Sequence, residues 1–176
     1  MTTKANRPKK RLRTNSFICY SGEQPEELFS YPPRGQYDVL VQAFREGIHR
    51  QAAQKGERAL TIQEHAVLAV TALFEEVNNG GYDQFFRNRS RKFLPIIVNS
   101  LMQIGLLAQA KITQKTVGTL GLRSISVPGI KAAMAKEINE RDDVLEECDR
   151  SFYKTQRGAA RKIYLFLKAN RAHIKV

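Results

Sequence analysis

The chain has 176 residues, 42% of them apolar, which suits a single domain with a substantial hydrophobic core. No apolar run approaches the roughly 18 residues of a membrane-spanning helix, and the apolar stretch at residues 17–20 is too short for the core of a signal peptide. These features predict a cytoplasmic protein with no membrane partner. Cys19 and Cys148 show no metal-ligand spacing and are too few for a disulfide scaffold, so we expect reduced thiols.

The charge balance is strongly positive. Lysine and arginine total 29 against 17 acidic residues, which gives a net charge of +12 and a pI near 10.0. An excess of this size favours an anionic partner, whether nucleic acid, an acidic protein or a membrane surface.

The N-terminal part of the chain differs in composition from the rest. Residues 1–15 carry six lysines and arginines and no acid, so we predict a disordered basic arm, either a solubilising tail or a nucleic-acid contact. Proline and glycine punctuate residues 16–36, which predicts an irregular lead-in with about one helical turn. The helical domain is expected over residues 37–176.

Helical periodicity begins after the lead-in. Apolar residues at helical spacing predict a helix over about residues 36–54, ended by Gly56. Thr61 and Glu64 then form a capping-box pattern, in which each side chain bonds the backbone N–H of the other residue. The segment that follows is apolar over more than half of its circumference as far as Val77, so we expect a central, buried helix.

The next segments continue this pattern, with one ambiguous stretch. Ser90 is the expected N-cap of a helix that ends at Gly105, and a short amphipathic helix follows over about residues 106–115. Residues 116–127 have mixed apolar spacing, so a loop is the first interpretation and a short strand pair the second.

Three helical segments complete the chain. Ser126 begins a helix expected to reach Ile138, residues 137–149 hold seven acids, and a last basic helix lies within residues 150–176. The acidic and basic segments are adjacent and are expected to pair with each other. The whole pattern predicts an all-α protein, a single globular bundle of about seven helices.

One stretch cannot continue a helix. Residues 78–81 read Asn-Asn-Gly-Gly, and paired glycines allow positive φ and close backbone approach. We expect residues 75–77 to form the last turn of the central helix, with one glycine as its C′ residue. Phe85 and Phe86 then return the chain to the core.

This corner is the strongest candidate site in the chain. Its first interpretation is structural, since asparagine caps helix ends and Asp83 or Gln84 can bond exposed backbone amides. A binding role is the second interpretation. The third is catalysis by Glu75, Glu76 and Asp83, because carboxylates with split pKa values can act as general acid and base.

Other catalytic signatures are absent from the sequence. The three histidines are scattered with no metal-binding spacing, and the chain contains no phosphate-binding glycine loop and no GxSxG motif. The sequence therefore predicts no metal site, no cofactor and no enzymatic activity.

The run at residues 76–88, Glu-Val-Asn-Asn-Gly-Gly-Tyr-Asp-Gln-Phe-Phe-Arg-Asn, resembles the hallmark of the DMP-type domain, a bacterial family of unknown function that includes a DNA-mimic protein. Two shorter elements are similar to the same family: Leu-Met-Gln-Ile-Gly at residues 101–105 and Asp-Arg-Ser-Phe-Tyr at residues 149–153. The resemblance covers residues 37–170 and implies an all-helical fold without known enzymatic activity. Its signature residues here are Glu76, Asn78, Asn79, Gly80, Gly81, Asp83, Gln84, Phe85, Phe86 and Asn88.

The chain departs from the DNA-mimic member in its charge. Mimicry needs a surface with negative charges spaced like phosphates, whereas this chain carries +12. We therefore expect a non-enzymatic interaction module whose partner is another protein or a second copy of the chain, and not a DNA mimic.

The alternative hypothesis is nucleic-acid binding through the basic clusters at residues 4–13, 87–92 and 150–175. The second alternative is the enzyme built on the corner carboxylates. The candidate anion- or partner-binding residues are Lys9, Lys10, Arg11, Arg13, Arg87, Arg89, Arg91, Lys92, Arg157, Arg161 and Lys162.

Overall fold

The computed structural model describes residues 20–33 and 35–176. The predicted basic arm, with Lys9, Lys10, Arg11 and Arg13, and Cys19 lie outside the described residues. Within the described part, all regular elements are helical, which confirms the all-α prediction. The α-helices are α1 (Pro25–Ser30), α2 (Tyr37–Lys55), α3 (Ile62–Arg87), α4 (Leu94–Gln103), α5 (Leu107–Gly118), α6 (Val127–Met134), α7 (Asn139–Thr155) and α8 (Ala159–Ala169). Three 3₁₀ turns are η1 (Glu57–Ala59), η2 (Arg89–Phe93) and η3 (Arg171–His173).

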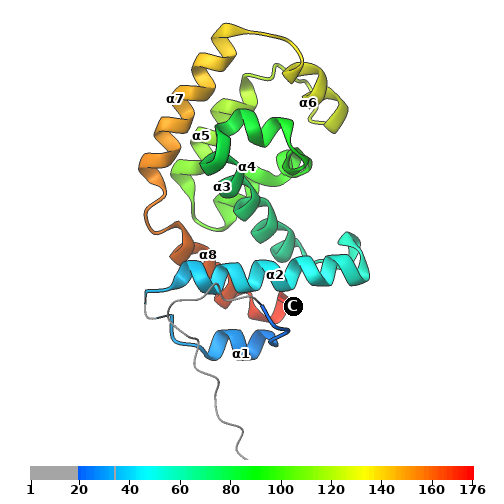
Figure 1. The fold of residues 1–176 in the computed structure, drawn as a ribbon, viewed down its shortest axis with the longest axis vertical. Helices are drawn as coiled ribbons and strands as arrows, with labels where there is room; N and C mark the ends of the chain where they lie inside the picture. Colours follow the sequence, from blue (N-terminus) through cyan, green and yellow to red (C-terminus); the bar gives the residue numbers. More distant parts are fainter. Residues whose placement is uncertain (1–19, 34) are drawn as a thin grey trace, which may run out of the picture.

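Helix α3 is the central element of the fold. It packs against α2, α4, α6, α7, α8 and η2. Figure 1 shows α1, α2 and α8 grouped at one end of the molecule, and α4 to α7 around the other end of α3. Val67, Leu73 and Val77 are fully buried in α3, because its apolar residues cover most of its circumference.

The predicted capping box begins α3. The Glu64 N–H donates to the Thr61 hydroxyl at 3.1 Å, and the Thr61 N–H donates to the Glu64 carboxylate at 2.8 Å. The second oxygen of the buried Glu64 carboxylate accepts the Lys175 N–H at 2.6 Å, which fastens the end of the chain to the start of α3. The Glu64 carboxylate therefore both caps α3 and holds the C-terminal segment against it.

The predicted N-cap at Ser90 is wrong. Turn η2 precedes α4, whose N-cap is Phe93, and Pro95 occupies the first turn of α4. The Ser90 hydroxyl instead donates to Glu76 at 2.6 Å. A proline in the first turn has no N–H to satisfy, so the helix depends less on a side-chain cap.

The segments after α4 confirm one expectation and correct others. Helix α5 reaches Gly118, beyond the expected residue 115. Residues 119–126 form a loop, which confirms the first interpretation there, and the alternative strand pair does not occur in this part of the structure. Ser126 caps α6 as predicted by accepting the Gly129 N–H at 3.2 Å. Helix α6 ends at Met134, before the predicted Ile138, and Ile138 has extended backbone (φ −138°, ψ 101°) before α7.

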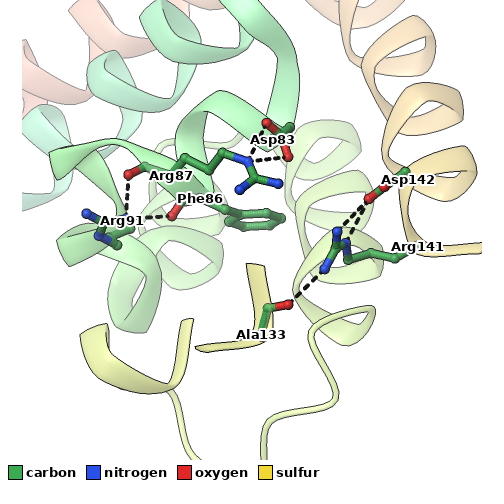
Figure 2. Close-up of polar contacts among 7 residues, drawn as sticks. All are labelled: Asp83, Phe86, Arg87, Arg91, Ala133, Arg141 and Asp142. Carbon is green, nitrogen blue, oxygen red and sulfur yellow. Dashed lines mark hydrogen bonds and ion pairs between the residues drawn. The ribbon is translucent and has the colours of Figure 1, made fainter. Parts of the chain in front are cut away.

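The early end of α6 is held by a buried arginine on α7. The Arg141 guanidinium donates to the Ala133 carbonyl at 2.9 Å and to the Asp142 carboxylate at 2.9 Å (Figure 2). One side chain thus satisfies a carbonyl at the C-terminus of α6 and joins α6 to α7.

Candidate functional site

The Asn-Asn-Gly-Gly corner is a break inside α3. Gly80 has φ −164° and ψ 24°, and Gly81 has φ 75° and ψ −175°, whereas the chain is helical before and after them. The predicted interruption is confirmed at the two glycines, but the helix reaches Asn79 and resumes at Tyr82. We call residues 76–88, together with 149–153, the α3 joint.

Glycine is required at the joint for two reasons. The Gly81 backbone lies in a region that is essentially restricted to glycine. A Cβ added to Gly81 would lie 2.2 Å from the Asp149 carboxylate, and one added to Gly80 would lie 2.3 Å from the Gln84 carboxamide. Each glycine therefore leaves room for a side chain of the joint: Asp149 lies against Gly81, and Gln84 lies against Gly80.

Helix α7 supplies the polar groups that close the break. The Asp149 carboxylate accepts the Tyr82 N–H at 2.8 Å, at the start of the second half of α3. The Tyr153 hydroxyl donates to the Val77 carbonyl at 2.7 Å, near the end of the first half. Two of the three elements that resemble the family, at residues 76–88 and 149–153, are thus two sides of one structural joint.

An aromatic cluster lies beneath these bonds. The fully buried Phe152 ring lies 4.8 Å from the Phe74 ring and 5.7 Å from the Tyr82 ring, between ring centroids. Phe85 and Phe86 are fully buried, as predicted. Burial raises the pKa of Tyr82 well above its ordinary value, although a hydrogen bond to Thr113 opposes that effect. Tyr82 is therefore a neutral core residue.

Glu76 is the acceptor at the centre of a second network. Its carboxylate accepts hydrogen bonds from Ser90 at 2.6 Å, Gln84 at 2.7 Å and Asn88 at 2.8 Å. Burial raises the pKa of Glu76, but the three hydrogen bonds outweigh it, and the net pKa is below the ordinary value of 4.5. The carboxylate fastens the turn after α3 to the body of the helix.

Replacing Glu76 by glutamine is expected to lower the free energy of unfolding by about 1–2 kcal/mol at pH 7, because a carboxylate that accepts three bonds is lost. A depressed pKa in the folded state stabilises the fold above the unfolded pKa, and this contribution is lost as pH falls through the folded pKa. The difference between wild type and Glu76→Gln should therefore shrink as pH falls below 4.5. Urea unfolding of both proteins at several pH values measures this difference in unfolding free energy. A difference that does not change with pH would contradict the stabilising role of the ionised Glu76 carboxylate.

The three candidate catalytic carboxylates have separate partners. Glu75 pairs with Arg45 at 2.7 Å, Glu76 accepts from the network above, and Asp83 pairs with Arg87 at 2.8 Å. The two cavities described below are not lined by any of them. The described residues also contain no group of three or more histidine, cysteine or acidic side chains that could hold a metal ion.

The remaining signature residues are exposed or half-buried. Asn78 accepts a hydrogen bond from Gln156 at 2.7 Å, which adds a bond across the joint. Asn79 is exposed, and Asp83 is half-buried with its carboxylate held by Arg87. Apart from Asn79, the signature residues are explained by helix geometry, core packing and internal hydrogen bonds.

The predicted basic cluster at residues 87–92 is largely engaged inside the molecule. Figure 2 shows Arg87 directed at Asp83, and Arg91 directed at the Phe86 and Arg87 carbonyls. Lys92 pairs with Glu57 and lies over the Phe93 ring. Arg89 is exposed and has no ion pair with the described acids.

The C-terminal cations lie elsewhere. Arg157 and Arg161 are exposed, and Lys162 donates to the Gly105 carbonyl at 2.8 Å. Helix α8 packs on α2, whereas η2 packs against α6, and Figure 1 shows α8 and α6 at opposite ends of the molecule. The cluster at 87–92 and the C-terminal cations therefore do not merge into one compact site.

The acidic segment forms few bonds with the basic segment after it. Arg150 pairs with Glu146, but Glu147 pairs with Lys115 of α5. Asp142 pairs with the buried Arg141. The predicted pairing between the two segments therefore holds for one pair at the boundary, while other acids of α7 bind cations outside the C-terminal segment.

A shallow, open cavity of about 380 Å³ lies between α8 and the α4–α5 corner. None of the ten signature residues lines it, although Ile104 and Gly105 belong to the element at residues 101–105. We call it the α8 groove; it is lined by Gln103, Ile104, Gly105, Lys162, Leu165, Phe166, Ala169 and Asn170. Leu165 is 44% exposed, and the nearby helix ends carry Met102 at 49% and Leu107 at 60%. Sequence reasoning did not identify the groove.

A second cavity of about 230 Å³ lies between α2 and the C-terminus. Arg50 and Lys175 contribute to its lining, and the Arg50 guanidinium donates to the Tyr20 carbonyl at 3.2 Å. The Arg50 side chain thus fastens Tyr20 to α2.

The fold is an all-helical domain organised around a glycine-broken central helix. The family profile of the DMP19-like proteins matches residues 58–170, more than half of the chain. The chain therefore belongs to the DMP19-like protein family. No curated protein and no solved structure matches it. None of the described helices combines the length and hydropathy that a membrane span requires.

Proposed function

We propose that the chain is a non-enzymatic interaction module that binds another protein. The observation that carries this proposal is the α8 groove, an open cavity of about 380 Å³ in which the apolar side chain of Leu165 is 44% exposed. Exposed apolar side chains in a concave surface are typical of protein-binding sites. The joint supports the proposal indirectly, because its carboxylates are occupied by internal partners.

The acidic surface of α7 does not favour DNA mimicry. Asp142, Glu146 and Glu147 each pair with an arginine or lysine, which neutralises part of the negative charge that mimicry requires. Family membership alone carries no single function, since function resides in particular surfaces.

Affinity capture tests the proposal with matched variants. The wild-type chain is expected to retain a protein from native lysate, and that protein should form a complex with the purified chain. Leu165→Glu should abolish the complex, because it places a charge in an apolar contact. Ile62→Glu is the control, since Ile62 is 73% exposed and does not line the groove. Equal capture by both variants, or a complex formed only with a second copy of the chain, would contradict this assignment.

Nucleic-acid binding is the second candidate function. It is favoured by the net charge of +12 and by exposed cations without ion pairs to the described acids, including Arg89, Arg157 and Arg161. Its affinity should fall linearly on a log–log plot against salt, with a slope of about −0.9 per phosphate contact on duplex DNA. Electrophoretic shifts with mixed DNA and RNA measure it, and absence of binding at low salt would exclude this candidate.

A further inference from the structure

Helix α8 carries two apolar stripes, and its packing in the fold uses only one. Ile163, Tyr164 and Leu167 are buried in the core. Lys162, Leu165, Phe166 and Ala169 lie at positions i, i+3, i+4 and i+7, the spacing of a second face. These four residues line the α8 groove. On this second face Leu165 and Ala169 are exposed and open to a partner, whereas Phe166 is half-buried against the core.

The opposite wall is formed by the corner between α4 and α5. Gly105 turns the chain with φ 82°, and Ile104 and Gly105 lie in the groove. Lys162 crosses the groove and donates to the Gly105 carbonyl, which joins the two walls at 2.8 Å. Met102 and Leu107, which lie on either side of this corner in the chain, are 49% and 60% exposed.

The charges around the groove have a single sign. Residues 84–136 and 150–176 contain no aspartate or glutamate, so α4, α5 and α8 contribute only positive charge. Lys111 lies one turn after Leu107, and Arg161 and Lys168 flank Leu165 at i−4 and i+3. All three are exposed, and none pairs with an acid of the described residues.

This charge pattern distinguishes between occupants. A second copy related by a two-fold axis through the groove would place lysines and arginines against their own counterparts. Residues 1–19 of the chain carry only positive side-chain charge, so they have the same sign as the rim. Nucleic acid would pair with the positive charges but would leave the leucine and methionine side chains without apolar contacts. An acidic partner with apolar side chains satisfies both features.

We propose that the α8 groove binds an acidic amphipathic helix of another protein, which deepens the proposed function and rests on it. The stripe from Lys162 to Ala169 runs for about 10 Å, so it faces about two turns of a bound helix. Apolar residues of that helix contact Leu165, Phe166 and Ile104. Its carboxylates face Lys111, Arg161 and Lys168.

Fluorescence anisotropy with designed peptides tests this proposal on the full chain. The probe is a labelled amphipathic peptide of about 18 residues, long enough for helix formation, with leucine on one face and glutamate on the other. One control peptide replaces each glutamate by lysine, and another keeps the composition but scrambles the pattern. The acidic amphipathic peptide should bind most tightly, and its affinity should fall with salt. Equal binding of all three peptides would overturn the proposal.

Variants locate the binding site. Leu165→Glu, in the groove, and Met102→Glu, next in the chain to Gln103 of the opposite wall, should each weaken binding about tenfold or more. Lys168→Glu should weaken it and reduce its salt dependence. Ile62→Glu and Lys136→Glu are the matched apolar and charge controls, because both residues are exposed and belong neither to α8 nor to the α4–α5 corner. Circular dichroism checks that each variant is folded.

The remaining outcomes separate this inference from the proposed function. If no peptide binds while the wild-type chain still captures a protein through Leu165, the partner class is wrong and the interaction role stands. If neither peptide binding nor protein capture is weakened by Leu165→Glu, both this inference and the proposed function fail. Tight binding of DNA that is lost in Leu165→Glu would assign the groove to nucleic acid and overturn the inference.

Discussion

Gly81→Ala is expected to lower the free energy of unfolding by about 3 kcal/mol. A residue with a Cβ in this backbone region costs about 1–3 kcal/mol. The added Cβ would also lie 2.2 Å from the Asp149 carboxylate and displace it from the Tyr82 N–H. The loss of that bond leaves a donor unsatisfied at the start of the second half of α3, which adds about 1 kcal/mol or more.

Gly118→Ala is the matched control for this prediction. Gly118 lies at the end of α5, its φ is not positive, and no atom lies within 4 Å of an added Cβ. The same substitution there is expected to be neutral or to stabilise by about 0.5–1 kcal/mol. Urea unfolding followed by circular dichroism compares the two variants. Equal stability of Gly81→Ala and wild type would show that the joint does not require glycine.

Phe152→Ala is expected to lower the free energy of unfolding by about 3–5 kcal/mol, the range for a buried phenylalanine. The ring is fully buried and contacts Phe74 from the first half of α3 and Tyr82 from the second half. Its removal leaves a cavity where α7 holds both halves of the broken helix. The same unfolding experiment measures the loss.

The neighbouring Tyr153→Phe variant is the comparison. It removes only the hydroxyl that donates to the Val77 carbonyl, so we expect a loss of about 1 kcal/mol. If Tyr153→Phe destabilised the protein as much as Phe152→Ala, the joint would depend on the hydrogen bond more than on the aromatic packing.

Local rules predicted the helical framework well. The capping box at Thr61 and Glu64 and the Ser126 cap need only residues a few positions apart, and both occur. The break at Gly80 and Gly81 also followed from the backbone freedom of glycine. Such features are set by chain geometry over one or two turns, so the sequence alone indicates them.

Contacts between distant segments were not predictable in this way. Asp149 bonds Tyr82 across 67 positions, and no local pattern in α7 marks that carboxylate as a cap. Ser90 looked like an N-cap, but the fold places Glu76 within its reach. The end of α6 depends on Arg141, which belongs to the next helix.

The α8 groove illustrates a second limit. Leu165 and Phe166 continue the apolar pattern of a helix that already has a buried face, so periodicity alone does not separate exposed from core positions there. Their exposure depends on where the α4–α5 corner lies, which tertiary packing determines. A count of apolar positions around the whole circumference of α8 would have indicated the second stripe.

We propose that the signature residues build the joint, whereas a partner binds in the α8 groove. One experiment compares partner capture and unfolding free energy for Glu76→Gln and Leu165→Glu. We predict that Glu76→Gln is less stable at pH 7 and still captures the partner, while Leu165→Glu keeps wild-type stability and loses capture. Loss of capture in Glu76→Gln at a temperature where the variant is folded, with capture retained in Leu165→Glu, would contradict the claim and place the binding site at the joint.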